Sequence, residues 1–216
     1  IIIDSLKIKL REFNFIFKES IIIFKTLKMK KYLFLVCVGG TYQKANIELH
    51  DVRWVIGSKI EDTFDDLRNS WFGNLEGFHI DSYKRINVVD GYRINVKQRC
   101  KNNKNYQNNT DPELKLWFVN IGGYDPSSMQ EKHEFGLIVA ASSNEAKNIA
   151  KTKWLCGCKN KHKDDIASLK IFQDVDNCKL IKNIDNWEIE LIPHESYVEE
   201  PNKPDWYGYM KIEKKN

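Results

Sequence analysis

Four short patterns in the sequence place a histidine two residues from a carboxylate. They are Glu48-x-His50, His79-x-Asp81, Glu131-x-His133 and His162-x-Asp164. In a β-strand, residues two apart point to the same face, so each pattern can present an imidazole nitrogen and a carboxylate oxygen in one direction. Two converging pairs would form a set of two imidazoles and two carboxylates, which suits Zn²⁺, Mn²⁺ or Fe²⁺. One hypothesis is therefore a divalent metal site, and a metal-dependent enzyme would also need an open coordination position and a substrate cleft.

The same residues also fit a structural role. A histidine beside a loop can exchange hydrogen bonds with backbone groups there, and an aspartate can orient its ring. The spacing matches no established metal motif, and the sequence contains no P-loop, GxGxxG, GxSxG or HExxH pattern. Catalytic residues are therefore unassigned, and whether the chain is an enzyme stays open at this point.

The patterns recur because the sequence contains an internal repeat. A shift of 83 residues aligns residues 33–81 with 116–164 and gives nine identical pairs among 49 positions. The second halves of the copies align at a larger offset of 95 residues, with 89–96 matching 184–191, which implies a 12-residue insertion in the second copy. The identical pairs include two of histidine, one of tryptophan, and two of glycine, which are predicted to form backbone turns after a strand: Gly39, Gly40, Gly122 and Gly123.

The repeat defines a domain organisation. We expect an N-terminal extension, a first repeat, a polar linker rich in Asn and Lys, a second repeat and a C-terminal tail. These correspond to residues 1–28, 31–98, 99–113, 114–192 and 193–216. Two copies are too few for a solenoid and indicate a pseudo-symmetric pair.

Each copy has the same order of predicted elements. An apolar strand that ends in Gly-Gly precedes a second strand, a helix with apolar residues at helical spacing, the later histidine segment and a hairpin. The first strands are expected at 32–38 and 116–121, and the helices at about 60–72 and 144–155. We therefore predict an α+β fold of two tandem repeats, each a β-sheet covered by one helix (about ββαββ), related by pseudo-twofold symmetry.

The order of these motifs resembles a known family. Strand-Gly-Gly, Glu-Leu-His-Asp-Val, His-Ile-Asp-Ser and Val-Asp-Gly-Tyr are echoed by Gly-Gly-Tyr-Asp-Pro, His-Glu-Phe-Gly and His-Lys-Asp-Asp. This pattern resembles the bacterial domain of unknown function 1543, which occurs as one or two copies per protein. The resemblance covers about residues 31–192. It implies tandem domains and implies no activity, because none is established for the family.

Composition limits the partners. The chain is 42% hydrophobic and 30% charged, and no apolar run approaches the 18 or so residues of a membrane span, so no membrane association is expected. Residues 1–31 hold eight Lys and Arg against three acidic residues, whereas the other 185 residues hold 26 basic and 27 acidic residues. The net charge of +4 thus comes from the N-terminal segment, and nucleic-acid binding is not expected of the repeats.

The sequence leads to three functional hypotheses. The first is a cytoplasmic, non-catalytic module that binds a ligand, a protein partner or a second copy of the chain. The second is a metal-dependent enzyme that uses the repeated Glu-x-His and His-x-Asp pairs. The third is nucleic-acid binding through the basic N-terminal arm.

Overall fold

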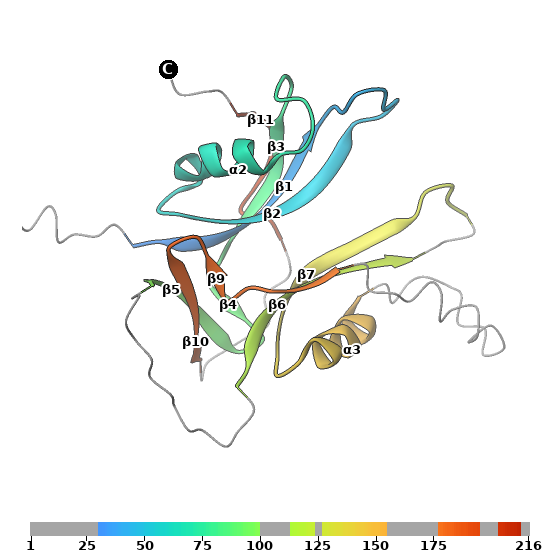
Figure 1. The fold of residues 1–216 in the computed structure, drawn as a ribbon. Helices are drawn as coiled ribbons and strands as arrows, with labels where there is room; N and C mark the ends of the chain where they lie inside the picture. The colour runs from blue at the N-terminus through green and yellow to red at the C-terminus, as the bar shows by residue number, and fades with distance from the viewer. Residues whose placement is uncertain (1–29, 100–112, 124–126, 155–176, 195–202, 213–216) are drawn as a thin grey trace, which may run out of the picture. The chain divides into compact units, whose positions relative to one another are not determined.

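Each repeat begins with a long antiparallel hairpin. A computed structural model describes residues 30–99, 113–123, 127–154, 177–194 and 203–212. The hairpins consist of β1 (Tyr32–Gly40) with β2 (Leu49–Gly57), and of β6 (Lys115–Gly123) with β7 (Lys132–Ala140) (Figure 1). Leu33 lies opposite Ile56, and Leu116 lies opposite Val139. Each residue of the second pair follows its counterpart in the first pair by 83 positions, so the two hairpins have the same register.

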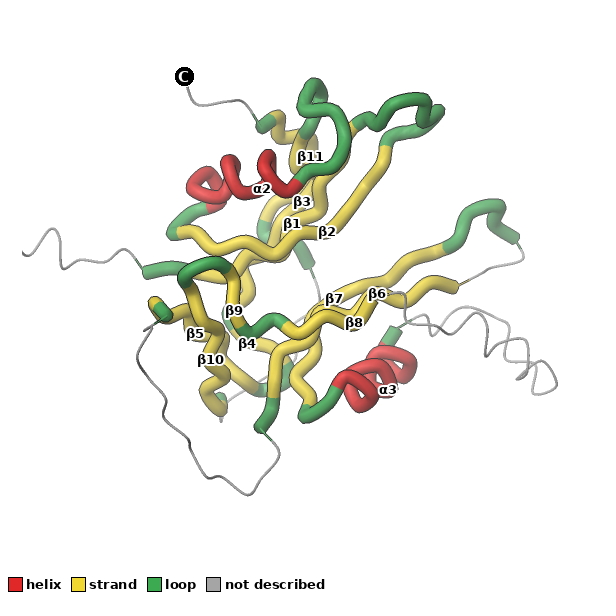
Figure 2. Tube along the Cα trace, in the orientation of Figure 1, coloured by secondary structure: helices red, strands yellow, loops and turns green. Residues whose placement is uncertain are grey.

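A helical segment follows each hairpin and covers one face of its sheet (Figure 2). In the first repeat it consists of a 3-10 turn, η1 (Ile60–Thr63), and the helix α2 (Phe64–Ser70), and in the second of α3 (Ser143–Lys153). The hydroxyl of Ser142 accepts a hydrogen bond from the Glu145 backbone N–H, which caps α3. Leu67 of α2 and Ala150 of α3 each belong to a hydrophobic cluster between the helix and the sheet of its repeat.

The first strand of each hairpin has a further neighbour. β3 (His79–Ile86) pairs with β1, and β8 (Asn177–Leu180) pairs with β6. The outer edge of β3 is covered by β11 (Trp206–Lys211), so the strand order of the first sheet is β11-β3-β1-β2. The predicted tail at 193–216 thus contains a strand that completes the first repeat's sheet.

The last hairpins of the two repeats form one sheet together. This sheet has the strand order β4-β5-β10-β9. Its strands are β4 (Val88–Val89), β5 (Tyr92–Gln98), β9 (Asn183–Ile184) and β10 (Trp187–Pro193). The α+β class is confirmed, but the expectation of a separate ββαββ sheet for each repeat is not. β5 and β10 are corresponding strands of the two repeats, and they pair with each other. Each strand thereby forms hydrogen bonds with an edge of the other that would otherwise be open.

A hydrophobic core shared by both repeats fills the faces opposite the helices. It contains Leu33, Leu35, Ile56, Ile86, Val89, Ile94, Leu116, Phe118, Val139, Ile181 and Ile189. A polar contact also joins the repeats, because the Asp90 carboxylate accepts from the Val139 backbone N–H at 2.9 Å and from the Lys153 ammonium at 2.6 Å. Asp90 and Gly91 occupy the turn of the hairpin at φ values of 46° and 82°, the positive values that an Asp-Gly turn between two strands adopts.

Among the described residues, no helix is both long and apolar enough to cross a membrane. The apolar residues after Met29 form β1, which is hydrogen-bonded to strands on both of its edges.

The centre of the shared sheet supports a prediction about pH. The pKa of Glu190 lies below its usual value of 4.5, because Asn95 and Lys97 donate hydrogen bonds to its carboxylate at 2.8 and 3.1 Å. A lowered pKa stabilises the fold above about pH 4.5, and this contribution is lost as the pH falls through the folded-state pKa. We expect Glu190→Gln to cost about 0.5–1 kcal/mol in the free energy of unfolding at pH 7.

Urea unfolding at pH 7 and pH 3 measures this difference, which should shrink at pH 3. The control is Glu113→Gln, because the carboxylate of Glu113 lies 4.0 Å from the Lys182 ammonium and should matter little. A cost of Glu190→Gln that is equal at both pH values would contradict the prediction.

Candidate functional site

Three strands bring the histidines of the first repeat to either side of a glycine. Gly39 on β1 lies opposite His50 on β2 and opposite His79 on β3. Lys211 on β11 lies opposite His79 and extends the row by one strand. Since β1 places residues two apart on one face, Gly39 continues the face on which Leu33 and Leu35 enter the shared core.

The four candidate residues of the first repeat converge around this row. Glu48 and Asp81 each lie within 4 Å of both imidazoles. The distances from Glu48 are 3.8 Å to His50 Nε2 and 3.5 Å to His79 Nδ1, and those from Asp81 are 3.6 Å to His50 Nε2 and 3.1 Å to His79 Nε2. We call this set of Glu48, His50, His79 and Asp81 the histidine–carboxylate quartet.

His79 is the buried member of the quartet. Its side chain is 2% exposed, whereas that of His50 is 58% exposed. Nδ1 of His79 lies 2.8 Å from the Gly77 carbonyl oxygen, and the ring stacks on Tyr209 with 4.1 Å between centroids. The space for the ring exists because residue 39 has no side chain: a Cβ there would lie 2.8 Å from Nε2 of His79.

A β-bulge in β3 occurs at Asp81. The register against β1 shifts between Cys37, opposite Ser82, and Val38, opposite Ile80, so Asp81 is the extra residue. Bulges of this kind re-aim a side chain relative to its strand. Here the Asp81 carboxylate reaches both imidazoles.

Both nitrogens of His79 lie within hydrogen-bond distance of oxygen atoms, those of the Gly77 carbonyl and the Asp81 carboxylate. In the part of the chain that the structure describes, no group of three or more His, Cys, Asp or Glu side chains is placed to hold a metal ion.

Cys37 lies on the same face of β1, two residues before Gly39. Burial raises the pKa of its thiol, and this effect exceeds the lowering by a hydrogen bond with Ser82. A protonated thiol is a poor nucleophile, so Cys37 is not a candidate catalytic group.

The second repeat reproduces part of this arrangement. His133 lies opposite Gly122, as His50 lies opposite Gly39, and its Nε2 is 3.5 Å from the Glu131 carboxylate. His162 and Asp164 lie outside the described residues. β8 is the counterpart of the end of β3. In the first repeat Leu33 pairs with Ile86, and in the second the Ile181 N–H donates to the carbonyl of Leu116, the counterpart of Leu33. Ile181 follows Ile86 by the larger offset of 95 residues. The insertion therefore precedes β8.

Sequence reasoning missed Tyr209, whose ring covers the quartet's buried histidine. The available signal was the aromatic run of residues 206–209, which is typical of a strand. Tyr209 also lines an open depression of about 580 Å³ beside the quartet. The other lining residues are Arg68, Leu75, Glu76, Gly77, Lys211 and Ile212.

The close approach at Gly39 generates a prediction. We expect Gly39→Ala to destabilise the protein by about 1–3 kcal/mol, because the added methyl group collides with a buried, hydrogen-bonded ring. In the His79→Ala background the collision is absent, so the same substitution should cost less. Urea unfolding of the two single variants and the double variant gives the coupling. Strictly additive costs would show that the ring does not depend on the absence of a side chain at residue 39.

Comparison with known proteins places the chain in a family. Residues 45–96 and 128–191 match the family described as Domain of Unknown Function (DUF1543), in two regions consistent with two tandem copies. Among the solved structures, the crystal structure of protein Il1583 from Idiomarina loihiensis has 33% sequence identity and a TM-score of 0.61. The match covers 85% of this chain and 99% of that one. No curated protein matches. This chain belongs to the DUF1543 family and holds two copies of its domain.

Proposed function

We propose that the protein is a non-catalytic binding module that binds a small ligand in the depression beside the first repeat's quartet. The observation that supports this most directly is exposed apolar surface at one end of this repeat. Tyr209 is 65% exposed and Leu75 is 47% exposed, and both line the depression. Phe72, which is 52% exposed, lies in the same loop as Leu75. Exposed apolar groups around a depression are typical of binding sites.

The quartet supports binding over catalysis. His79, its buried imidazole, contacts an oxygen at each nitrogen and lies beneath the ring of Tyr209. A general base needs a nitrogen within hydrogen-bond reach of a substrate proton. We propose that the quartet instead fixes the position of Tyr209, and thereby one wall of the depression.

We also propose that the two repeats form a pseudo-twofold pair. In the shared sheet, Asn95 lies opposite Glu190, and these residues differ by the repeat offset of 95. The Arg99 N–H donates to the Asn186 carbonyl at 2.8 Å, and the N–H of His194, the counterpart of Arg99, donates to the carbonyl of Gly91, the counterpart of Asn186, also at 2.8 Å. A cytoplasmic location remains part of the proposal. The apolar residues 32–38 and the lysines before them resemble a secretion signal, but these apolar residues form the central strand β1.

A ligand-observed NMR screen of uncharged aromatic and aliphatic fragments tests the binding site. We expect fragments to bind the full chain and to lose binding in Tyr209→Ala, because the exposed ring is removed. Tyr207→Ala is the matched control, since Tyr207 is 79% exposed on the same strand and does not line the depression.

Because Tyr209 also packs on His79, Leu75→Ser provides a second variant that leaves this stack in place. Thermal unfolding establishes that each variant is folded. Fragments that bind equally to the wild type and to both lining variants would place binding elsewhere and refute the proposal.

A metal-dependent enzyme is the second candidate function. The convergence of Glu48, His50, His79 and Asp81 favours it, since two carboxylates lie within 4 Å of the half-exposed His50 ring. The contacts of His79 disfavour it, because a metal would have to displace Asp81 or the Gly77 carbonyl from a ring nitrogen.

Elemental analysis of the purified chain separates these candidates. We expect Zn, Mn and Fe at well below one equivalent. One equivalent in the wild type that is lost in a folded His50→Ala/His79→Ala variant would replace the binding proposal by the metal site. Nucleic-acid binding remains a prediction about residues 1–28, which lie outside the described residues.

A further inference from the structure

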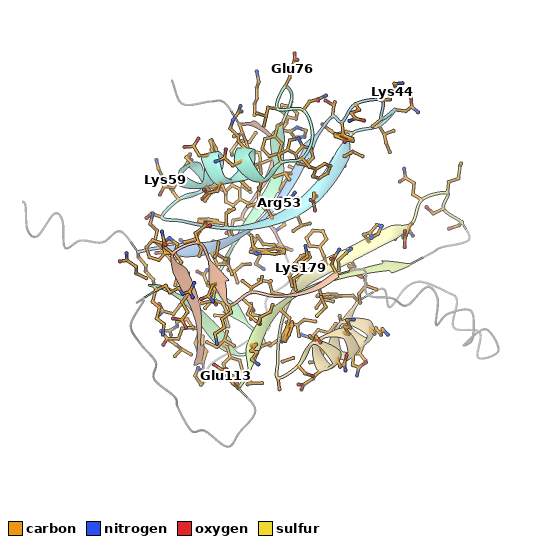
Figure 3. The ribbon with its side chains drawn as sticks, viewed as in Figure 1. Lys44, Arg53, Lys59, Glu76, Glu113 and Lys179 are labelled. Carbon is orange, nitrogen blue, oxygen red and sulfur yellow. The ribbon has the colours of Figure 1, made fainter. Side chains whose placement is uncertain are left out.

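The charged side chains of the depression indicate what its ligand carries. Arg68 and Lys211 contribute two positive charges, and Glu76 contributes one negative charge. Glu76 lies in the loop between α2 and β3 (Figure 3). With a net charge of about +1, this set complements a monoanion, and the carboxylate would disfavour a dianion such as a phosphate ester.

Arg68 is held in place at the wall. Its Nη1 donates to the Ile212 carbonyl at 2.7 Å, which links α2 to the end of β11. A guanidinium has five N–H donors, and the described contacts give it this one hydrogen bond, so donors remain for a ligand. Guanidinium groups match the two oxygens of a carboxylate. Arg68 can therefore position an anionic group without losing its contact with the backbone.

The other side of the depression is apolar. Tyr209 lies with its ring stacked on His79 and its hydroxyl 3.4 Å from the Gly77 carbonyl, so its orientation is fixed from two directions. Leu75 and the buried Ile212 extend this surface. A ligand that fits both sides has an anionic end and an aromatic or aliphatic body.

We infer that the depression binds a small carboxylate with an aromatic body, whose carboxylate contacts Arg68 and Lys211 and whose ring packs on Tyr209 and Leu75. This inference rests on the proposed function and adds the chemical class of the ligand. The quartet contributes by positioning Tyr209.

Four probes test the class: 3-phenylpropionate, its neutral amide 3-phenylpropanamide, the cation phenethylamine, and inorganic phosphate. Binding to the full chain is measured by ligand-observed NMR or calorimetry. We expect 3-phenylpropionate to bind most tightly, the amide to bind several-fold more weakly, and phenethylamine and phosphate to bind weakest, because only the acid satisfies both sides of the depression.

Two variants locate the carboxylate. We expect Lys211→Gln to weaken 3-phenylpropionate about fivefold and to leave the amide nearly unchanged. Lys44→Gln is the control, because Lys44 is an exposed lysine in the loop between β1 and β2 (Figure 3) and does not line the depression.

The outcomes separate the inference from the proposed function. If acid and amide bind equally and both lose affinity in Tyr209→Ala, the depression binds apolar groups and the carboxylate inference is wrong. If phosphate binds more tightly than 3-phenylpropionate, the monoanion inference is also wrong. If no probe and no uncharged fragment binds, the proposed function fails together with the inference.

Discussion

The antiparallel pairing of β5 with β10 is the interaction on which the rest of the fold depends. It joins the ends of both repeats in one sheet, and the residues above and around it fill one hydrophobic core contributed by both copies. Each repeat covers one face of its first sheet with its own helix and relies on this shared core for the other face. Because one face of each first sheet is buried against the other repeat, neither repeat has a complete core of its own. Burial of apolar surface is the dominant favourable term in folding, so the fold depends on both copies.

The same face that enters the shared core also positions the quartet. Along β1, Leu33 and Leu35 lie in the core, and Gly39 follows on that face where the core ends. The absence of a side chain at Gly39 leaves room for the His79 ring, and the bulge at Asp81 brings a carboxylate to one of its nitrogens. The ring of Tyr209 on β11 covers one face of the imidazole. A buried imidazole is stable only when its nitrogens have partners, and here both do.

Local patterns in the sequence predicted the elements and missed how the strands pair. The hairpins, the Ser142 cap and the turn at Asp90 are explained by residue types within a few positions of each other, and the spacing of two indicated only that each histidine and its carboxylate could face the same way. The convergence of the two pairs depends on β1 lying between β2 and β3 and on the bulge at Asp81, neither of which has a local signal. The pairing of β5 with β10 has no local signal in the sequence, because a β-strand with one open edge can pair with any compatible partner. Tyr209 was missed for the same reason, since 120 or more residues separate it from the strand it covers.

The two repeats differ where the binding site is proposed, and the difference follows from what was added to each. β11 covers the outer edge of β3 and supplies Tyr209, Lys211 and Ile212 to the depression. In the second repeat the 12-residue insertion precedes β8, the counterpart of the end of β3, and within the described residues β8 pairs only with β6. Since a duplicated fold retains the residues that both copies need, the glycine, glutamate and histidine of the hairpin are explained by the common fold. The additional strand β11 distinguishes the first repeat from the second, and the depression in which we propose that a ligand binds lies in this repeat.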